Sequence, residues 1–353
     1  MPTHWMYPSF VSVANAQIDI PPGFELVTCP GCESASWTVA RIGADWALDP
    51  ERTIQIVRCD SCGLHYTNPR PKLAELGKYY PDEYGPYRRQ RGEIERDSVT
   101  STALRLMVLR NAYAESSLRP KGWRRALATA VSILKPAEHW GFAVEYRGKG
   151  RVLDFGCGNG TFLRRMRALG WDATGIDFSE SAVKAVRESG LKALQGTLPH
   201  PDLAPKSFDL VTMRSALEHL PDPREVLCAI RDLLDDDGLL VIQVPNFASW
   251  EIEYFGDAAL TLDLPRHLLH MTPDTLNDLL VRCGLRVLSL KQICRASWLR
   301  KSLAQIERRG PRPSDALLRI KPICQLAALR AQRHGRGNEL IAVATRASSP
   351  DSV

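Results

Sequence analysis

The feature that most constrains the fold is a predicted strand that leads into a glycine-rich turn and then a helix. The segment reads Arg151-Val-Leu-Asp-Phe-Gly-Cys-Gly-Asn-Gly160, and a helix is predicted to begin at Thr161. Glycine has no Cβ, so these glycines let the backbone turn tightly and approach a bound ligand closely. Such a turn joins a buried parallel strand to its crossover helix, which predicts an α/β sheet with a ligand at its edge.

Apolar runs and amphipathic stretches alternate from residue 151 onward, as parallel strands and their crossover helices do. The predicted strands are Arg151–Phe155, Ala173–Asp177, Lys192–Gln195, Phe208–Met213, Gly238–Val244, Leu285–Leu290 and Glu339–Thr345. The predicted helices span about 161–169, 179–189, 223–234 and 273–283. The last helix begins with Thr272 and Pro273, the residue types preferred at the N-cap and the first helical position.

Two aspartates indicate the chemistry of the ligand. Asp154 stands just before the glycine loop, where a pyrophosphate would gain nothing from it and a cationic group would. Asp177 closes the second predicted strand and can accept both hydroxyls of a ribose. The spacing G-x-G-x-G, with Thr161 after it, also departs from the G-x-G-x-x-G of nicotinamide dinucleotide sites. The pattern favours a cationic ligand that carries a ribose.

At this point the chain resembles the class I S-adenosylmethionine-dependent methyltransferases. Their motif D-x-G-x-G-x-G corresponds here to Asp154, Gly156, Gly158 and Gly160. The segments 207–211 and 237–246 are similar to the family's fourth and fifth strands, and the resemblance covers about 148–292 and 337–347. It implies an α/β, Rossmann-like core of seven strands, the last antiparallel, with S-adenosylmethionine as cosubstrate.

The resemblance also implies which residues bind the cosubstrate. The glycine loop would lie under the methionine portion, Asp154 near its amino group and Asp177 on the ribose. The implied binding residues are Asp154, Gly156, Cys157, Gly158, Gly160, Asp177, Phe178, Gly196, Thr197 and Arg214. The acidic residue that commonly reaches the adenine amino group is missing, so Gln195 or a backbone carbonyl would replace it.

A second motif predicts a metal site near the N-terminus. Cys29-Pro-Gly-Cys32 and Cys59-Asp-Ser-Cys62 form two C-x2-C pairs separated by 26 residues. Two such knuckles supply the four thiolates of a tetrahedral Zn²⁺ site. A pair of redox C-x-x-C motifs is the alternative, but no βαβ pattern surrounds them. A closed four-thiolate site has no position for substrate, so we predict a structural Zn²⁺.

These motifs divide the chain into segments. We predict an irregular arm at 1–22, a zinc ribbon at 23–70, a helical linker or lid at 71–147, a methyltransferase core at 148–347 and a tail at 348–353. A basic helical insert occupies 293–336 of the core, with 11 basic and 2 acidic residues.

The distribution of charge bears on the partners. The net charge of the 353 residues is +6, but residues 1–70 carry 4 basic and 7 acidic side chains. An acidic ribbon argues against nucleic acid as the partner. The basic insert and the helices at about 101–134 favour a lid packed on the core. A homodimer contact and a peripheral contact with anionic membrane lipid remain open.

Cysteine content and hydropathy bear on the compartment. Nine cysteines in 353 residues are too sparse for a disulfide scaffold, and no signal peptide or long apolar run is visible. We expect a cytoplasmic protein, with membrane association at the cytoplasmic face left open.

Candidate catalytic residues follow the fourth and fifth predicted strands, because ligands lie at the carboxyl ends of such strands. They are Glu218, His219, His267 and His270. The segment that holds His267 resembles the P-[RH]-H sequence of methyltransferases that act on sugars and lipid-linked small molecules. An alcohol acceptor benefits from a base that removes its proton, and His267 is our preferred general base. The alternative is a capping or packing residue before the helix at 273.

Glu218 and His219 resemble a pair in O-methyltransferases of ubiquinone biosynthesis and of small-RNA 2′-O-methylation. In those enzymes Glu-x-x-Glu-His and a distant His hold Mg²⁺. Ser215 stands here in place of the first Glu, so the sequence argues against a catalytic metal. The alternative for His219 is a loop residue that hydrogen-bonds to backbone.

Two aromatic clusters have two interpretations each. The segment Tyr79-Tyr-Pro-Asp-Glu-Tyr84 follows the ribbon, as in bacterial methyltransferases of polysaccharide and secondary-metabolite pathways that carry an N-terminal zinc ribbon. Its rings would cover the sulfonium or the substrate, or form a seam between ribbon and core. Phe247, Trp250, Tyr254 and Phe255 would wall an acceptor pocket or pack the insert.

The sequence therefore predicts transfer of a methyl group to a small-molecule acceptor. The preferred acceptor is a hydroxyl of a sugar, lipid-linked or secondary-metabolite substrate, and a carbon acceptor is the lesser alternative. An RNA methyltransferase that docks RNA on the ribbon and basic flanks is the alternative. A non-catalytic interaction protein is a third class, opposed by the intact glycine loop and Asp177.

Overall fold

The computed structural model describes residues 20–46, 48–80, 99–134, 144–307, 310 and 313–347. Most of the predicted arm, Tyr84 of the aromatic segment and the predicted tail lie outside these residues.

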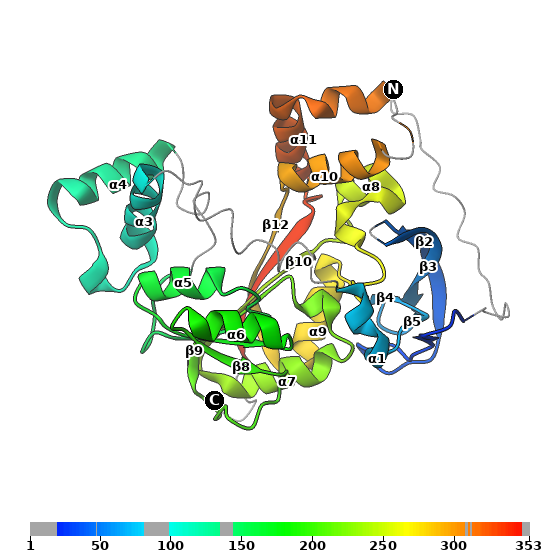
Figure 1. The fold of residues 1–353 in the computed structure, drawn as a ribbon, viewed down its shortest axis with the longest axis horizontal. Coiled ribbons are helices and arrows are strands. Elements are labelled where there is room, and N and C mark those ends of the chain that lie inside the picture. Colours follow the sequence, from blue (N-terminus) through cyan, green and yellow to red (C-terminus); the bar gives the residue numbers. More distant parts are fainter. Residues whose placement is uncertain are drawn as a thin grey trace.

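A seven-stranded sheet forms the centre of the molecule (Figure 1). The strand order is β12-β13-β10-β9-β6-β7-β8, and β13 runs antiparallel to both of its neighbours. The other neighbouring strands of this sheet, from β10 to β8 in the strand order, pair in parallel. The strands are β6 (Arg151–Phe155), β7 (Asp172–Asp177), β8 (Lys192–Gln195), β9 (Phe208–Arg214), β10 (Leu234–Pro245), β12 (Leu285–Ile293) and β13 (Glu339–Arg346). The predicted Rossmann-like α/β sheet is confirmed.

Helices cover both faces of this sheet. They are α5 (Thr161–Ala168), α6 (Glu180–Glu188), α7 (Pro223–Leu233) and α9 (Pro273–Arg282), within one residue of the predicted bounds. Apolar side chains of α5 and α6 join one buried cluster, and those of α7 and α9 join another. Side chains of Ser179, Asp222 and Thr272 cap three of the helices, as short polar residues do.

Two predicted strands are clearly longer than expected, since β12 ends at Ile293 instead of Leu290 and β10 extends at its start. β10 begins at Leu234 instead of Gly238, because Leu234 already pairs with Phe208 of β9. The register then shifts before Leu239, which allows polar residues inside the strand.

The N-terminal ribbon is joined to the core by a shared sheet. Its strands are β1 (Phe24–Glu25), β2 (Trp37–Asp45), β3 (Asp49–Cys59), β4 (His65–Thr67) and β5 (Arg70–Pro71). The four-stranded sheet has the order β11-β4-β3-β2, and β11 (Leu269–His270) comes from the core. Buried Val57 and Tyr66 of the ribbon belong to the same apolar cluster as Leu217 and Leu268 of the core.

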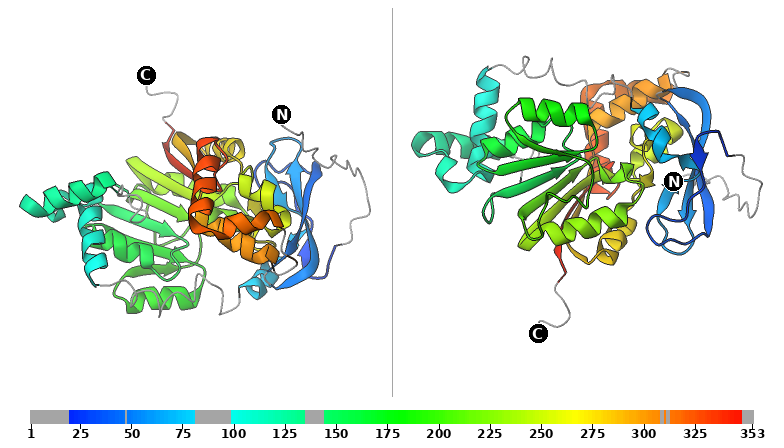
Figure 2. Two further views of the ribbon diagram at one scale, coloured as in Figure 1. Left: turned by 90° about the horizontal axis from the view of Figure 1, so that it is seen from above. Right: turned by 60° about the horizontal axis from the view of Figure 1, so that its bottom comes forward.

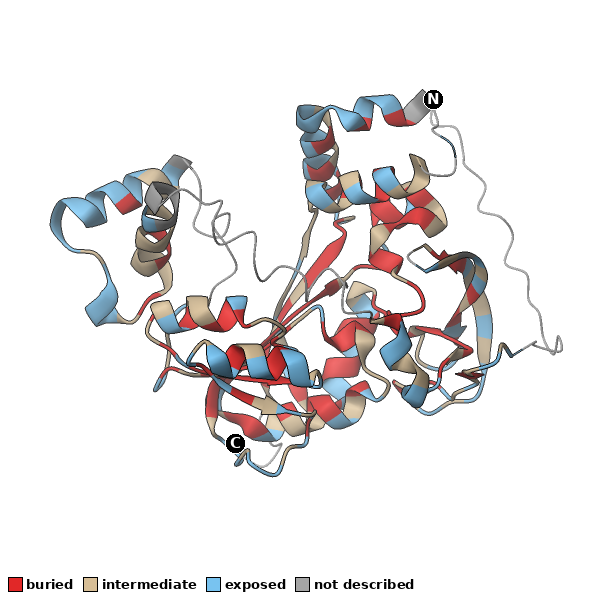
Figure 3. Ribbon diagram, viewed as in Figure 1, coloured by how far each residue is buried: buried red, intermediate tan, exposed pale blue. Residues whose placement is uncertain are grey.

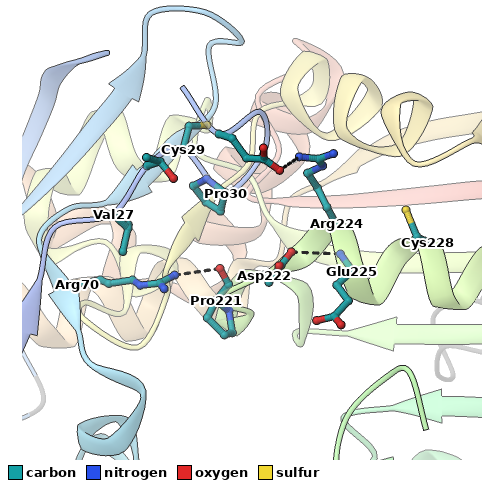
Figure 4. Close-up of a pocket in the computed structure, with 11 residues that line it drawn as sticks. Val27, Cys29, Pro30, Arg70, Pro221, Asp222, Arg224, Glu225 and Cys228 are labelled. Carbon is teal, nitrogen blue, oxygen red and sulfur yellow. Dashed lines mark hydrogen bonds and ion pairs between the residues drawn. The ribbon is translucent and has the colours of Figure 1, made fainter. Parts of the chain in front are cut away.

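A cavity of about 550 Å³ lies at the boundary between ribbon and α7 (Figure 4). Two contacts bridge the boundary there. Arg224 pairs with Glu33 at 2.5 Å, and the Arg70 guanidinium donates to the carbonyl of Pro221 at 2.9 Å. The ribbon therefore contacts the core at β11 and at the turn before α7, besides the apolar contact of β3 described below.

The linker and the insert are helical and lie apart from each other. Helices α3 (Val99–Tyr113) and α4 (Gly122–Leu134) lie at the end of the molecule opposite the ribbon (Figures 1 and 2). α4 is largely exposed, whereas the central strands are buried (Figure 3). None of the helices described is long and apolar enough to cross a membrane.

The insert packs beside the ribbon. It contains α10 (Ala296–Glu307) and α11 (Lys321–Arg333), and α8 (Trp250–Phe255) lies against it. Phe255 is buried in one apolar cluster with Ile54 and Ile56 of β3 and Leu299 of α10. The second aromatic group of the sequence is thus used mainly for packing.

Candidate functional site

The glycine loop adopts a conformation that requires glycine. Gly156, Gly158 and Gly160 have φ values of 72°, 49° and 71°, a region that side chains rarely adopt. A Cβ at Gly156 would lie 2.9 Å from the side chain of Ala216, and one at Gly160 would lie 2.9 Å from Val186. The loop is therefore packed against the turn after β9 at Gly156 and against α6 at Gly160, and it has open space at Gly158.

Asp177 holds this loop from the end of the neighbouring strand. One carboxylate oxygen accepts the amide of Gly158 at 2.8 Å, and the other accepts the amide of Ser179 at 2.9 Å. Burial raises the pKa of Asp177, while these two amides oppose the rise. The carboxylate thus shapes the loop and retains lone pairs for a ligand.

Asp154 lies deeper, at the end of β6. It is 2% exposed and accepts the hydroxyl of Thr212 at 2.7 Å. Burial raises its pKa to about 7, against the opposing effects of Arg214 and Thr212. A cationic group near this position would favour the ionised carboxylate.

The other predicted cofactor residues differ in their placement. Phe178 is 62% exposed beside Asp177, and the amide of Gly196 donates to the Asp177 carbonyl at 2.9 Å. Thr197 is exposed, and Cys157 is buried in the loop. Arg214 donates to the side-chain oxygen of Gln243 at 3.0 Å, so it faces the end of β10.

Three predicted catalytic residues gather at the same edge of the sheet. Glu218 and His219 lie in the 3-10 turn Leu217–His219 after β9, and His267 precedes β11. The rings of His219 and His267 are 4.8 Å apart, and His267 Nε2 lies 4.0 Å from Glu218 Oε1. Residues almost fifty positions apart therefore form one cluster, which we call the Glu–His cluster.

Backbone carbonyls orient both histidines of the Glu–His cluster. His267 Nδ1 lies 3.0 Å from the carbonyl of Thr261, and His219 Nδ1 lies 3.0 Å from that of Arg266. A carbonyl only accepts, so each Nδ1 carries the proton and each Nε2 has a free lone pair. Burial lowers the pKa of His267, and it lowers that of His219 to about 3, which keeps both rings neutral.

Glu218 is the polar residue of the cluster without partners. It is 1% exposed, and neither carboxylate oxygen has a hydrogen-bond partner among the residues that the structure describes. Burial raises its pKa to about 8, and the nearby acids Glu339 and Asp263 add to the rise. A buried carboxyl group without partners indicates that a ligand group or a cation completes its environment.

The Glu–His cluster also fits a divalent cation. One ligand atom each from Glu218, His219 and His267 lies within 4.8 Å of the others. Two neutral imidazoles and a carboxylate are a usual ligand set for such ions, and backbone carbonyls orient the rings as in known sites. The substitution at Ser215 therefore leaves three ligands in place.

Tyr80 connects the cofactor side of the site to the Glu–His cluster. Its hydroxyl lies 2.9 Å from His219 Nδ1, and its ring contacts those of His219 and Phe178, with both centroid distances 5.9 Å. Its neighbour Tyr79 is buried instead against Phe24. One tyrosine thus forms the seam and the next faces the site, a difference that the sequence does not indicate.

His270 and Phe247 belong to the junction of ribbon and core. His270 is buried, with Nε2 3.1 Å from the hydroxyl of Thr67. The ring of Phe247 lies 4.6 Å from that of His65 and 5.5 Å from that of His270. The structure therefore separates His270 from the other catalytic candidates.

The four ribbon cysteines form one cluster. Cys29 Sγ lies 3.5 Å from Cys62 Sγ, and Cys32 Sγ lies 3.5 Å from Cys59 Sγ. All four sulfur atoms lie within 4.8 Å of one another, and none belongs to a disulfide. Four converging thiols fit the tetrahedral ligand set of a structural Zn²⁺.

The central segment of the chain matches a known protein family. Residues 115–290 match the family model described as "Methyltransferase domain". The ubiquinone biosynthesis O-methyltransferase of Bordetella avium (strain 197N) is 38% identical over 103 residues, which are 27% of this chain and 43% of that protein. The enzyme of the same name from Xanthomonas campestris pv. campestris (strain B100) is 39% identical over 129 residues, which are 34% and 54%. The chain thus spans about half the length of these relatives.

Solved structures give weaker matches. An S-adenosylmethionine-dependent methyltransferase from Mesorhizobium loti matches with a TM-score of 0.41 and 18% identity, over 57% of this chain and 94% of that one. A methyltransferase from Archaeoglobus fulgidus matches with a TM-score of 0.40 and 21% identity, over 57% and 88%.

The cysteine cluster generates a first prediction. We expect Cys59→Ser to lose bound Zn²⁺ and to unfold at a lower temperature, because metal binding contributes several kcal/mol to the stability of such small modules. Zinc content by mass spectrometry and thermal unfolding measure the two effects. Cys228→Ser, in α7 outside the cluster, is the matched control and should keep its zinc. A Cys59→Ser protein with full zinc content would refute the site.

The burial of Asp154 generates a second prediction. Its pKa is about 7 in the folded state and lower when unfolded, so the stability that its protonated form contributes at low pH is lost as pH rises toward 7. Asp154→Asn should therefore stabilise the ligand-free protein by roughly 1 kcal/mol or more at pH 8, with a smaller gain at pH 5. Thermal unfolding at both values measures this. The exposed Asp172→Asn should show no such gain, and a destabilised Asp154→Asn at pH 8 would contradict the argument.

Proposed function

Because residues 115–290 of this chain belong to the methyltransferase-domain family, we propose that the protein transfers the methyl group of S-adenosylmethionine to a hydroxyl of a small molecule. One observation carries the proposal. The glycine loop with its two aspartates and the Glu–His cluster lie at the same edge of the sheet, and Tyr80 contacts both sides through Phe178 and His219.

The cofactor side supports a cationic nucleoside ligand. S-adenosylmethionine supplies a methyl group on a positively charged sulfur that a nucleophile can displace. In this proposal Asp177 accepts the ribose hydroxyls and Asp154 interacts with the amino group of the ligand. Two buried carboxylates favour a cation at this edge and disfavour a pyrophosphate. The glycine loop, held by Asp177 before any ligand binds, requires little reordering on binding.

The Glu–His cluster supports a hydroxyl acceptor. An alcohol must lose its proton as its oxygen attacks, and a positioned base assists that step. We assign this role to Nε2 of His267, which has a free lone pair because Nδ1 faces the carbonyl of Thr261. The carboxylate of Asp263 lies 3.9 Å from Nε2 and stabilises the imidazolium once the proton has moved. His219 lies beside them and fixes the hydroxyl of Tyr80.

A divalent cation is the alternative role of the cluster. Glu218, His219 and His267 would hold it, and it would lower the pKa of an acceptor hydroxyl bound to it. The two roles differ in their need for metal, since a general base acts without it. The effect of EDTA on the reaction rate, described below, distinguishes them.

The acceptor class follows from two facts. The curated relatives carry the name O-methyltransferase, and the polar atoms without partners at this edge suit hydroxyl groups better than an apolar carbon acid. We propose a sugar, a lipid-linked small molecule or a secondary metabolite. Docking of RNA on the ribbon is the second candidate; the ribbon's net acidic charge opposes it.

The test is a methyl-transfer assay. Purified protein with S-[methyl-³H]adenosylmethionine should label members of a panel of polyhydroxyl acceptors, which contains catechols, nucleotide sugars and polyprenyl-linked sugars. Calorimetry should show binding of S-adenosylhomocysteine, and Asp177→Ala should weaken it at least ~10-fold through loss of charge-assisted hydrogen bonds to the ribose. If the assay transfers the label to transfer RNA and to none of the small molecules, the small-molecule assignment is overturned.

A further prediction concerns His267. His267→Ala should bind S-adenosylhomocysteine as the wild type does and turn over at least ~10²-fold more slowly, the usual scale of general-base assistance. His334→Ala, an exposed histidine after α11, is the control. EDTA should leave the wild-type rate unchanged, whereas loss of activity restored by Mg²⁺ would assign the cluster to a metal. Wild-type turnover by His267→Ala excludes both roles.

A further inference from the structure

The ribbon is hydrogen-bonded to the segment that carries the candidate base. β11 pairs antiparallel with β4 over both of its residues. Past the end of this ladder, the amide of Thr67 donates to the carbonyl of Leu268 at 2.9 Å. The contact between ribbon and core therefore reaches the residue that follows His267.

The side chain of Thr67 makes the next contact. Its hydroxyl donates to the carbonyl of His267 at 2.8 Å and lies 3.1 Å from Nε2 of His270. A hydroxyl has one proton, which goes to the carbonyl, so it accepts from the imidazole. Thr67 is 1% exposed, so these bonds are shielded from solvent. A buried threonine of the ribbon thus holds the backbone of His267 on one side and a histidine of β11 on the other.

The same backbone segment extends the contact to Glu218. The amide of Leu268 donates to the carbonyl of Glu218 at 2.7 Å, while its own carbonyl accepts from Thr67. Arg70 of β5 reaches the same turn, with its guanidinium 2.9 Å from the carbonyl of Pro221 (Figure 4). Both loops of the Glu–His cluster are therefore tied to ribbon residues that lie close together in sequence.

The second cysteine pair directly precedes β4, the strand that carries Thr67. Cys59 is the last residue of β3. Its amide donates to the carbonyl of Leu64 at 2.9 Å, and its carbonyl accepts the amide of Gly63 at 3.0 Å. This closed turn contains Cys62 and leads into β4, which begins at His65. The turn that carries the sulfur atoms of Cys59 and Cys62 therefore lies directly before the start of β4.

From these contacts we infer that the ribbon is a positioning module for the Glu–His cluster: its cysteines set β4, and Thr67 sets the backbone of His267 and, through Leu268, that of Glu218. The inference rests on the proposed function for the role of the cluster. In this inference the ribbon acts on the Glu–His cluster of its own chain, and its role does not depend on a separate partner. Thr67 and Arg70 are positioning residues, since neither reaches the cofactor loop.

The test compares Thr67→Val with Thr67→Ser in the full-length, zinc-loaded protein. Valine matches threonine in shape and lacks the hydroxyl, whereas serine keeps it. Amide hydrogen exchange needs no acceptor, and we expect Thr67→Val to exchange faster at 264–271 and 215–222 and unchanged at 151–170. Thr67→Ser should match the wild type. Thr38→Val, at an exposed position of β2, is the control for a threonine on the surface of the ribbon.

The kinetic readout separates positioning from general weakening. With the acceptor identified above, Thr67→Val should lower kcat at least ~10-fold and leave the KM for S-adenosylmethionine unchanged, because small displacements of a catalytic group cost rate more than binding. Thr67→Ser should restore kcat. If no acceptor is found, the proposed function is in question, yet the exchange experiment still decides the inference.

Equal exchange and equal turnover of Thr67→Val and wild type would overturn the inference. Should Thr67→Val fail to fold, Arg70→Gln tests the second contact. It is expected to accelerate exchange at 215–222 and to lower kcat with zinc content unchanged. Wild-type behaviour of Arg70→Gln at that point would equally overturn the inference.

Discussion

The contact between the Asp177 carboxylate and the Gly158 amide is the constraint on which the site depends. It joins the end of β7 to the loop that follows β6, at 2.8 Å. The loop can approach so closely only because its glycines adopt positive φ angles. Parallel pairing of β6 with β7 brings the two strand ends to one edge of the sheet. The conformation of the loop and the position of the Asp177 carboxylate therefore both depend on the sheet topology.

Burial then determines the chemistry of this edge. Asp154, Asp177 and Glu218 are all buried there, and burial raises the pKa of each. A site with several desolvated acids is stabilised by positive charge or by hydrogen-bond donors. The protein's net charge of +6 lies elsewhere in the sequence, in the linker and insert, and does not describe the site. A basic protein thus presents an acidic edge to its ligand.

The sequence predicts this sheet well and the junction poorly, for a physical reason. Strands and helices of 151–292 are long, periodic and capped by local residues, so each reveals itself within a short window. The contact of Thr67 with His267 joins residues 200 positions apart, and β11 has only two residues. No local pattern marks either one. Likewise, Tyr79 and Tyr80 are identical in type, and only the folded chain turns one inward and the other toward His219.

The shortness of these strands explains what the ribbon adds. A three-residue β4 and a two-residue β11 form too few hydrogen bonds to persist as an isolated pair in water. β3, with eleven residues, provides a firm neighbour for β4, and the cysteine turn fixes where β4 starts. The core supplies the remaining partner in β11. Each half lacks what the other provides, so the Glu–His cluster acquires its geometry only when the ribbon and the core fold together.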